Sequence, residues 1–138
     1  FISWPGAQSV SGKGATASAD WIPYSRQKLA ELRAQSQPVF IDFTATWCIT
    51  CQVNKRVALN DEAVVRRFGE LEIVRMKADW TLQDPEITQA LAEFGRNGVP
   101  LYVFYPRQGQ AKVLPEILTP SLVIEAISTS SPASASPR

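Results

Sequence analysis

The sequence predicts an α/β fold, with a mixed sheet of about four strands flanked by helices on both faces. Three observations support this prediction. Helical and β-rich segments alternate along the chain, a short Gly-containing turn joins the last two β-rich segments, and one β-rich segment is apolar on both faces. The middle part of the 138-residue chain, 21–128, has the length of one domain.

Helix signals recur through this domain. The expected helices carry apolar residues at helical spacing, and most begin at a capping residue or close to a proline in the first turn. They cover residues 25–35, 48–59, 62–68, 84–95 and the stretch from 119 onward. In the second of these helices we expect Val53 and Val57 to be buried.

The β-rich segments lie between the helices, at residues 39–45, 71–78, 99–105 and 111–114. The first is dominated by β-branched and aromatic residues on both faces, which predicts a central strand covered by helices on both sides. Right-handed crossovers then place the loop after this strand at the carboxyl end of the sheet, where α/β proteins usually carry their sites.

Both flanks of the domain are poor in apolar residues. Residues 1–20 are rich in Gly, Ser and Ala and are expected to form a flexible arm, and residues 129–138 are expected to form a disordered tail. The start, Phe1-Ile2-Ser3-Trp4, lacks the features of an intact signal peptide. The missing initiator Met favours an excised part of a longer protein.

Composition excludes several classes of function. The net charge of +1 argues against an electrostatic nucleic-acid binder. No apolar run approaches the length of about 18 residues that spans a membrane. The chain has no histidine, which removes Ser-His-Asp and Cys-His catalysis and most zinc sites.

Cys48 and Cys51 are the two cysteines of the chain, and they follow the predicted central strand closely. The start of a helix favours a thiolate at Cys48, and Cys51, one turn further in, is placed to attack a mixed disulfide formed there. A zinc site would need further Cys or His ligands that the chain lacks, and the position between strand and helix argues against an inert core pair. We expect a redox site whose only redox group is the Cys48–Cys51 disulfide, without a metal or a cofactor.

Three further features of the sequence raise separate questions. Asp42 interrupts the apolar strand, and it is either a buried acid that passes protons to and from Cys51 or an edge-facing or salt-bridged carboxylate; we favour the first. Trp47 is either a core aromatic or an exposed docking surface beside the thiols. The Val99–Pro100 bond opens the third predicted strand and is open to a cis conformation.

Three separated motifs carry a resemblance to a known family. They are Phe40-Ile41-Asp42-Phe43, Trp47-Cys48-x-x-Cys51 and Gly98-Val99-Pro100. Together they resemble the thioredoxin fold over about residues 25–128. The longer stretches 42–54, 77–81 and 94–102 resemble the C-terminal domain of DsbD/ScsB-type thiol:disulfide interchange proteins.

The resemblance implies a role for each central residue. Cys48 would be the attacking thiol, Cys51 the resolving thiol and Asp42 the proton-handling acid, with a cis Val99–Pro100 bond beside them. In that family a membrane-embedded domain passes electrons to this periplasmic domain, which passes them to a further periplasmic domain. The resemblance therefore implies a protein-disulfide reductase in the periplasm, as a soluble domain of an inner-membrane protein, with residues 1–20 as the tether.

The sequence departs from the general thioredoxin pattern around the cysteines. Ile49-Thr50 stands between them instead of Gly-Pro. Lys55 occupies a position where some family members carry an acid, and a cation there would favour a thiolate; the sequence leaves open whether it faces the site or solvent. Arg75 and Lys77 are possible counter-charges for the acid on the neighbouring strand, and we expect only one of them to be a good candidate.

Two other functions remain open from the sequence. The domain could be a free-standing periplasmic thioredoxin-like protein, acting as a reductant or as an oxidant. It could also be a non-catalytic thioredoxin-fold adaptor that keeps its cysteines as a structural pair. We expect a monomer when the domain is isolated.

Overall fold

The computed structural model describes residues 21–128, and the predictions for 1–20 and 129–138 lie outside the described residues. The strands are β1 (Trp21–Pro23), β2 (Val39–Thr44), β3 (Val74–Asp79), β4 (Leu101–Tyr105) and β5 (Lys112–Leu114). The helices are α2 (Arg26–Ala34), α3 (Ile49–Asn54), α4 (Glu62–Glu70), α5 (Pro85–Glu93) and α6 (Pro120–Ser128). A π-helical segment, Lys55–Leu59, continues α3 directly.

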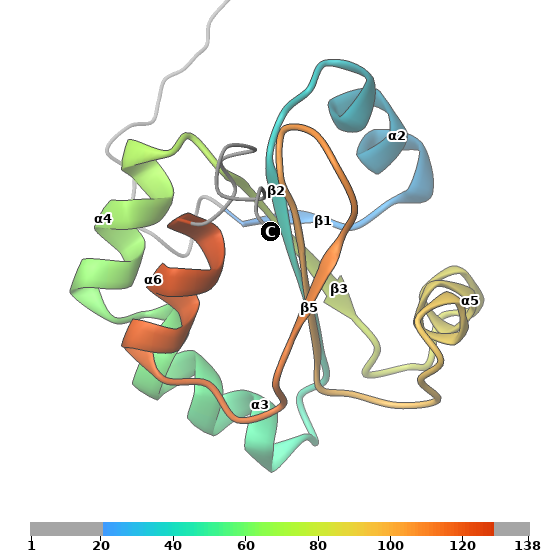
Figure 1. Cartoon of the computed structure of the whole chain (residues 1–138). Helices are drawn as coiled ribbons and strands as arrows, with labels where there is room; N and C mark the ends of the chain where they lie inside the picture. Colours follow the sequence, from blue (N-terminus) through green and yellow to red (C-terminus); the bar gives the residue numbers. More distant parts are fainter. Residues whose placement is uncertain (1–20, 129–138) are drawn as a thin grey trace, which may run out of the picture.

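The strands form one five-stranded sheet in the order β1-β3-β2-β4-β5 (Figure 1). β2 lies at its centre, parallel to β3 and antiparallel to β4, and β4 and β5 form the predicted hairpin. The predicted mixed sheet is confirmed, and β1 is an addition to it. This three-residue strand ends in a proline and shows no alternation, so the sequence gives it no strand signal; it pairs with β3 at the edge, with Trp21 opposite Arg75.

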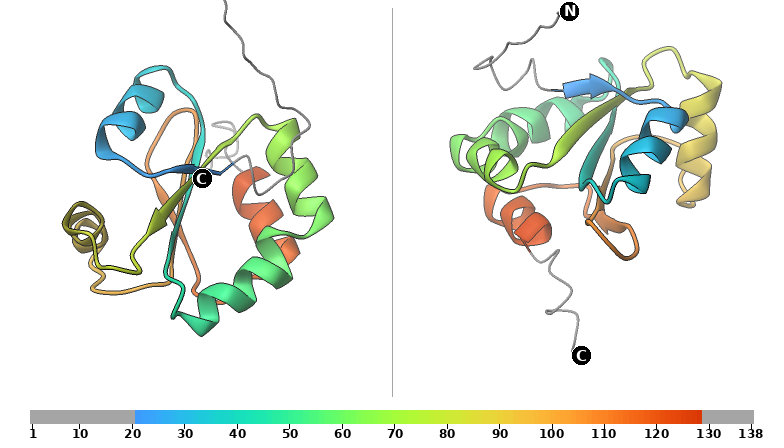
Figure 2. Two further views of the ribbon diagram at one scale, coloured as in Figure 1. Left: turned by 180° about the vertical axis from the view of Figure 1, so that it is seen from behind. Right: turned by 90° about the horizontal axis from the view of Figure 1, so that it is seen from above.

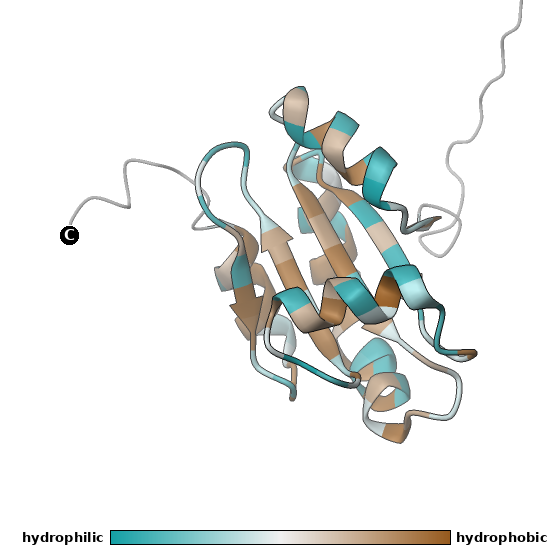
Figure 3. Cartoon of the chain, turned by 90° about the vertical axis from the view of Figure 1, so that its right-hand side faces the viewer, coloured by the Kyte–Doolittle hydropathy of each residue, from teal (hydrophilic) through white to brown (hydrophobic). Residues whose placement is uncertain are grey.

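Helices cover both faces of the sheet, as predicted (Figure 2). α2 and α5 lie on one face, where Ile41 and Phe43 of β2 belong to the core beneath them. α3, α4 and α6 lie on the other face, where Phe40 packs in a second core with α4 and α6. The neighbouring strands β2 and β4 are largely apolar along their length, which Figure 3 shows by hydropathy, whereas charged residues alternate along β3. β2 is therefore buried on both sides.

The prediction that Val53 and Val57 are buried is wrong. Their exposed fractions are 43% and 48%. The buried residues of this helical stretch are Cys51, Asn54, Ala58 and Leu59, and the first three are spaced three and then four apart. Because that spacing defines one helical face, the two valines lie outside it and point away from the core.

The helix ends follow from their capping residues. The Ser25 hydroxyl accepts a hydrogen bond from the Lys28 backbone N–H at 2.9 Å, and the Asp61 carboxylate caps α4 in the same way. Gly95 follows α5 with a φ of +74°, a conformation that favours glycine. Between residues 21 and 128, no helix has both the length and the apolar character required to cross a membrane.

Candidate active site at the Cys48–Cys51 pair

The loop that carries Cys48 lies at the carboxyl end of β2, as the sequence predicts. It joins the central strand to α3, and Cys48 is the N-cap residue of that helix. The end of β3 lies beside it, because the Trp80 backbone N–H donates to the Thr44 carbonyl at 2.7 Å. The ends of the parallel strands β2 and β3 therefore support the loop that carries Cys48.

Cys48 and Cys51 are joined by a disulfide, with their Cα atoms 5.3 Å apart. The Cys51 backbone N–H donates to the Cys48 sulfur at 3.2 Å. Cys48 keeps 8% of its surface exposed and Cys51 only 1%. The Cys48 sulfur is thus the more accessible one, and it lies where backbone N–H groups at a helix start stabilise a thiolate.

Trp47 is exposed and held by contacts with its neighbours, so it is not a core aromatic; its role as a docking surface stays a prediction. Its exposed fraction is 52%. The indole N–H donates to the Thr81 carbonyl at 3.0 Å, and its ring centroid lies 5.9 Å from that of Trp80. Ile49, between the cysteines, is 79% exposed, and Thr50 is half-buried. Trp47 and Ile49 therefore present apolar surface on either side of Cys48.

The loop before β4 reaches the cysteines from another part of the chain. The Val99–Pro100 peptide bond is cis, as the resemblance implies. Val99 packs against the small cluster formed by Ala45, Cys48 and Cys51, and Pro100 is buried. The third motif of the sequence thus lies at the site.

Asp42 lies on the central strand and is 3% exposed. Its Oδ1 atom has no hydrogen-bond partner among the described residues, and it forms no ion pair there. It is therefore neither an edge-facing nor a salt-bridged carboxylate. Burial raises the pKa of Asp42 to about 7, although Lys55 and then Lys77 lower it. Near neutral pH this acid is close to equally divided between its two protonation states.

A cavity of about 240 Å³ gives access to this acid. It is lined by Trp21, Asp42, Lys55, Asn60 and Lys77. Lys77 is the β3 residue directly opposite Asp42 in the sheet register. Both lysines share the cavity with the carboxylate, so Lys55 lies at the cavity of Asp42; an effect of its charge on the cysteines stays a prediction.

Arg75 takes a different place on the same face of β3. It is two residues before Lys77, so its side chain shares that face, but it does not line the cavity. Its guanidinium lies 5.1 Å from the centre of the Phe68 ring and 5.9 Å from that of Trp21. Lys77, and not Arg75, is the counter-charge that faces Asp42. The two residues share a face of β3, but only Lys77 is opposite Asp42 in the register.

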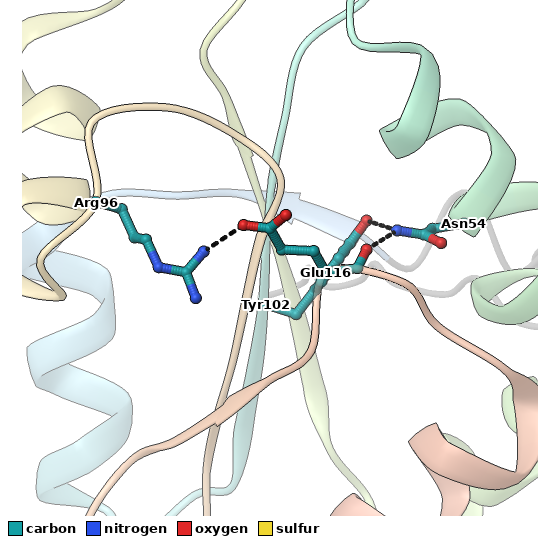
Figure 4. A network of polar contacts seen from close by, with 4 residues as sticks. All are labelled: Asn54, Arg96, Tyr102 and Glu116. Carbon is teal, nitrogen blue, oxygen red and sulfur yellow. Dashed lines mark hydrogen bonds and ion pairs between the residues drawn. The ribbon is translucent and has the colours of Figure 1, made fainter.

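Asn54 forms a polar network that the sequence did not reveal (Figure 4). Its amide donates to the Tyr102 hydroxyl at 2.9 Å and to the Glu116 carbonyl at 2.6 Å, and its oxygen accepts from the Leu118 N–H at 3.1 Å. An ion pair of 3.1 Å joins Glu116 to Arg96. α3 is thereby tied to β4, to the segment before α6 and to the loop that leads to the cis proline. The available signal was the position of Asn54, three residues after Cys51 on a helix.

Within residues 21–128, no three His, Cys, Asp or Glu side chains are grouped so that they could hold a metal ion. The cysteine loop carries a disulfide, and a carboxylate and two lysines line the cavity at Asp42. This set can exchange disulfides and move protons.

Comparisons with known proteins agree with this geometry. Residues 20–106 match a family model described as thioredoxin-like. The thiol:disulfide interchange protein DsbD of Campylobacter jejuni is 25% identical over 105 residues, 76% of this chain and 18% of that protein. DsbD of Yersinia pestis is 30% identical over 88 residues, 64% of this chain and 14% of that protein. The chain thus spans less than a fifth of the length of these relatives.

A solved structure extends the comparison to the fold. The C-terminal domain of Neisseria meningitidis DsbD, in its oxidised form, superposes with a TM-score of 0.65 at 23% identity. The match covers 80% of this chain and 99% of that domain. The thioredoxin fold and the resemblance to DsbD-type proteins, both predicted from sequence motifs, are confirmed.

Proposed function

Because the chain belongs to the thioredoxin-like family, we propose that it works as a thiol-disulfide oxidoreductase module in which Cys48 and Cys51 reduce disulfides of partner proteins. The observation that carries this proposal is the pair itself. A disulfide closes the first turn of α3, and the sulfur with more exposure lies at the helix start. A purely structural pair has no need of that placement.

The reduction proceeds in two balanced steps. The Cys48 thiolate attacks a partner disulfide, so that a Cys48–partner bond forms, the partner's S–S bond breaks and one partner thiolate leaves. Cys51 then gives up its proton and attacks the Cys48 sulfur, which forms the Cys48–Cys51 bond and releases the second partner thiolate. The partner has gained two electrons and binds two protons, and the module has lost two electrons.

Asp42 is the acceptor for the Cys51 proton in this scheme, directly or through water. A carboxyl group with a pKa of about 7 is well suited to accept and release a proton at neutral pH. Its position beneath the cysteine loop, on the strand that leads into it, supports this role. Lys55 lies one turn after Cys51 and shares the cavity with Asp42, which links the acid to the cysteine helix.

The exposed apolar residues at the site supply the docking surface for the partner. Trp47 and Ile49 flank Cys48, and Val99 packs against the cysteines from the opposite side. An apolar segment next to a partner disulfide would cover these side chains as it approaches the Cys48 sulfur. The half-buried Thr50 adds to the rim, and the buried Pro100 follows Val99 in the chain.

The relatives suggest the setting in which this exchange occurs. Proteins named thiol:disulfide interchange protein are several times longer than this chain. The module would then receive electrons from a membrane-embedded domain of the same parent protein and pass them to a disulfide-bearing protein or domain in the periplasm. As an isolated domain it would be a monomer.

The test is to trap the first step. A reduced Cys51→Ser variant, mixed with an oxidised disulfide protein such as insulin, should accumulate a mixed disulfide through Cys48, and Cys48→Ser should not. The unsubstituted domain should reduce the insulin without accumulating the adduct. If neither variant forms an adduct and the unsubstituted domain leaves insulin oxidised, the module is a non-catalytic adaptor.

The direction of electron flow needs a second measurement. A reduction potential near that of thioredoxin, about −270 mV, identifies a reductant, as proposed. A potential near that of DsbA, about −120 mV, identifies an oxidant and contradicts the proposed direction.

A further inference from the structure

The cavity beside Asp42 connects a buried acid to the surface. Asp42 is buried, whereas Asn60 and Lys77 on the same cavity are exposed and Lys55 is partly exposed. Asp42 is therefore the buried member of the cavity lining, and the residues that carry the ammonium groups are in part exposed to solvent. Any proton that Asp42 takes up must leave again before the next cycle, and this cavity is the space between the carboxylate and solvent.

Lys55 differs from Lys77 in the element that carries it. Lys77 lies on β3, opposite Asp42, so the strand pairing alone fixes its position. Lys55 is the first residue of the π-helical segment and follows Cys51 by one turn. It is therefore the charge that links the cysteine helix to the acid.

Resting on the proposed function, we propose that Lys55 is a positioning residue for proton transfer: through the cavity that both residues line, its charge keeps Asp42 able to accept the Cys51 proton and to release it to solvent. Of the charges at this acid, Lys55 lowers the pKa of Asp42 more than Lys77 does. Lys55 acts through Asp42 and takes no part in the sulfur chemistry.

Other ionisable groups also face this region. Tyr102, opposite Asp42 on β4, stays neutral because burial and the nearby carboxylate raise its pKa further. Asp79 of β3 is held ionised by hydrogen bonds from Thr81, with smaller contributions from the two lysines. Arg75 shares the face with Lys77 but does not line the cavity, and its guanidinium lies over the rings of Phe68 and Trp21. Tyr102 reaches α3 through the hydrogen bond that it accepts from Asn54 but carries no charge, and neither Asp79 nor Arg75 lines the cavity. Lys55 is therefore the charge to vary.

The proton balance of the step is simple. The Cys51 thiol transfers its proton to the Asp42 carboxylate, and the resulting Cys51 thiolate forms the disulfide with Cys48. Neutral Asp42 then returns its proton to water in the cavity, next to the ammonium groups. Without the Lys55 charge, the acid would hold its proton more tightly, so fewer molecules would have a free carboxylate at pH 7.

The test separates the two thiol steps. The reduced domain is mixed with 5,5′-dithiobis(2-nitrobenzoate), whose released thiolate is coloured. Attack by Cys48 gives the first release, and attack by Cys51 on the Cys48 adduct gives the second. The leaving group needs no proton, so the pH dependence of the second release reports the loss of the Cys51 proton.

Lys55→Met should raise the pH midpoint of the second release by roughly half a unit to one unit, and Lys55→Glu by more, because a nearby opposite charge is lost or reversed. At pH 7 the second release of Lys55→Met should slow by about threefold, following the smaller carboxylate fraction. Arg56→Gln is the matched control, since Arg56 is the next residue, carries the same charge and is exposed outside the cavity. Its two phases should match those of the unsubstituted domain.

Two results would overturn the inference. One is a Lys55→Met profile that matches the Arg56→Gln profile, and the other is a shift confined to the first release, which would mean that Lys55 acts on Cys48 directly. In an Asp42→Asn background, Lys55→Met should have no further effect on the second release.

A separate measurement keeps this inference distinct from the proposed function. The titration of the Asp42 carboxyl carbon, followed by NMR in the oxidised domain, needs no disulfide exchange. It should move to higher pH in Lys55→Met and stay in place in Arg56→Gln. An unmoved Asp42 titration contradicts the role of Lys55, whereas a failure to reduce any disulfide with a moved titration contradicts only the proposed function.

Discussion

The two faces of β2 are built differently. On the face under α2 and α5, Val39, Ile41 and Phe43 join a core of apolar side chains. On the face under α3, α4 and α6, Phe40 is followed by Asp42 and Thr44, both buried. The buried Asp, Asn, Thr and Arg side chains of residues 21–128 all lie on this second side, and Asp42 and Thr44 each have an oxygen without a hydrogen-bond partner among the described residues.

Both faces carry an apolar core, but the second face also buries polar side chains on the strand that leads to Cys48. Apolar burial is favourable, whereas a buried polar atom without a partner costs free energy of the order of 1–3 kcal/mol. The unpartnered oxygens lie at the end of β2 that leads to Cys48, where a proton acceptor has a use. We therefore expect substitutions on the first face to change stability alone, and substitutions on the second to change the response to pH.

The largest effect should come from the first face. Phe43→Ala removes a fully buried ring from the apolar core and should lower the free energy of unfolding by about 3–5 kcal/mol. Denaturant unfolding measures this loss. In the fraction that stays folded, the rate of thiol release from the Cys48 adduct should change less than twofold. A rate that falls in parallel with stability would mean that the first face also affects the chemistry.

Asp42→Asn should act in the opposite direction on stability. Because burial raises the pKa of Asp42 from 3.8 to about 7, the folded chain binds the proton more tightly than the unfolded chain, and stability falls as pH rises through that window. Asn cannot ionise, so the oxidised variant should escape this loss. Its free energy of unfolding relative to the parent domain should rise by on the order of 3 kcal/mol from pH 3.5 to pH 8. Denaturant unfolding at both pH values measures the gain, and a parent stability that rises with pH would contradict it.

The same substitution should slow the chemistry. With the proton acceptor lost, resolution of the Cys48 adduct by Cys51 should fall by about a hundredfold at pH 7, the lower end of what general base catalysis contributes. The rate should then rise with pH without an inflection near 7. Stopped-flow release of the coloured thiolate provides the profile, and equal rates for both proteins from pH 6 to 9 would exclude Asp42 from the proton path.

Asn54→Ala tests the polar network of the second face. It removes partners from the Leu118 N–H and the Glu116 carbonyl, and should cost about 1–3 kcal/mol of unfolding free energy. Hydrogen exchange at Leu118 should quicken relative to an amide in β2. A cost near zero with unchanged exchange would mean that water replaces the amide without loss.

The smallest effect is expected at the surface. Arg96→Gln breaks the ion pair with Glu116, whose side chains are 31% and 61% exposed, and should cost less than about 1 kcal/mol. Because salt screens exposed charges, the cost should shrink further at 1 M salt. A larger, salt-independent loss would place this pair among the buried polar contacts instead.

The sequence predicted the parts of the molecule that leave a local pattern. Four strands, the hairpin and the position of the cysteine loop follow from apolar periodicity and from the connection rules of α/β sheets. β1 left no such pattern, since three residues ending in proline gain their strand conformation only from pairing with β3. The burial of Val53 and Val57 was misjudged because the helix phase is set by Cys51 and Asn54, and apolar character alone does not reveal it.

The residues of the site also divide into those that the sequence predicts and those that it does not. The cysteines, Asp42 and the cis proline lie in motifs and were predictable. The orientation of Lys55 was not, because a lysine on a helix gives no sign of what it faces until the helix is placed on the sheet. The links from Asn54 to Tyr102 and Glu116 span more than 40 residues of sequence and carry no local signal.

Selective alkylation can show whether this pair is a working dithiol with one attacking sulfur. The reduced domain is treated with iodoacetamide between pH 6 and 7, and the labelled cysteine is identified by mass spectrometry over time. The account predicts fast labelling of Cys48 with Cys51 left unmodified. Slow labelling of both cysteines, at the rate of an ordinary thiol, would contradict it.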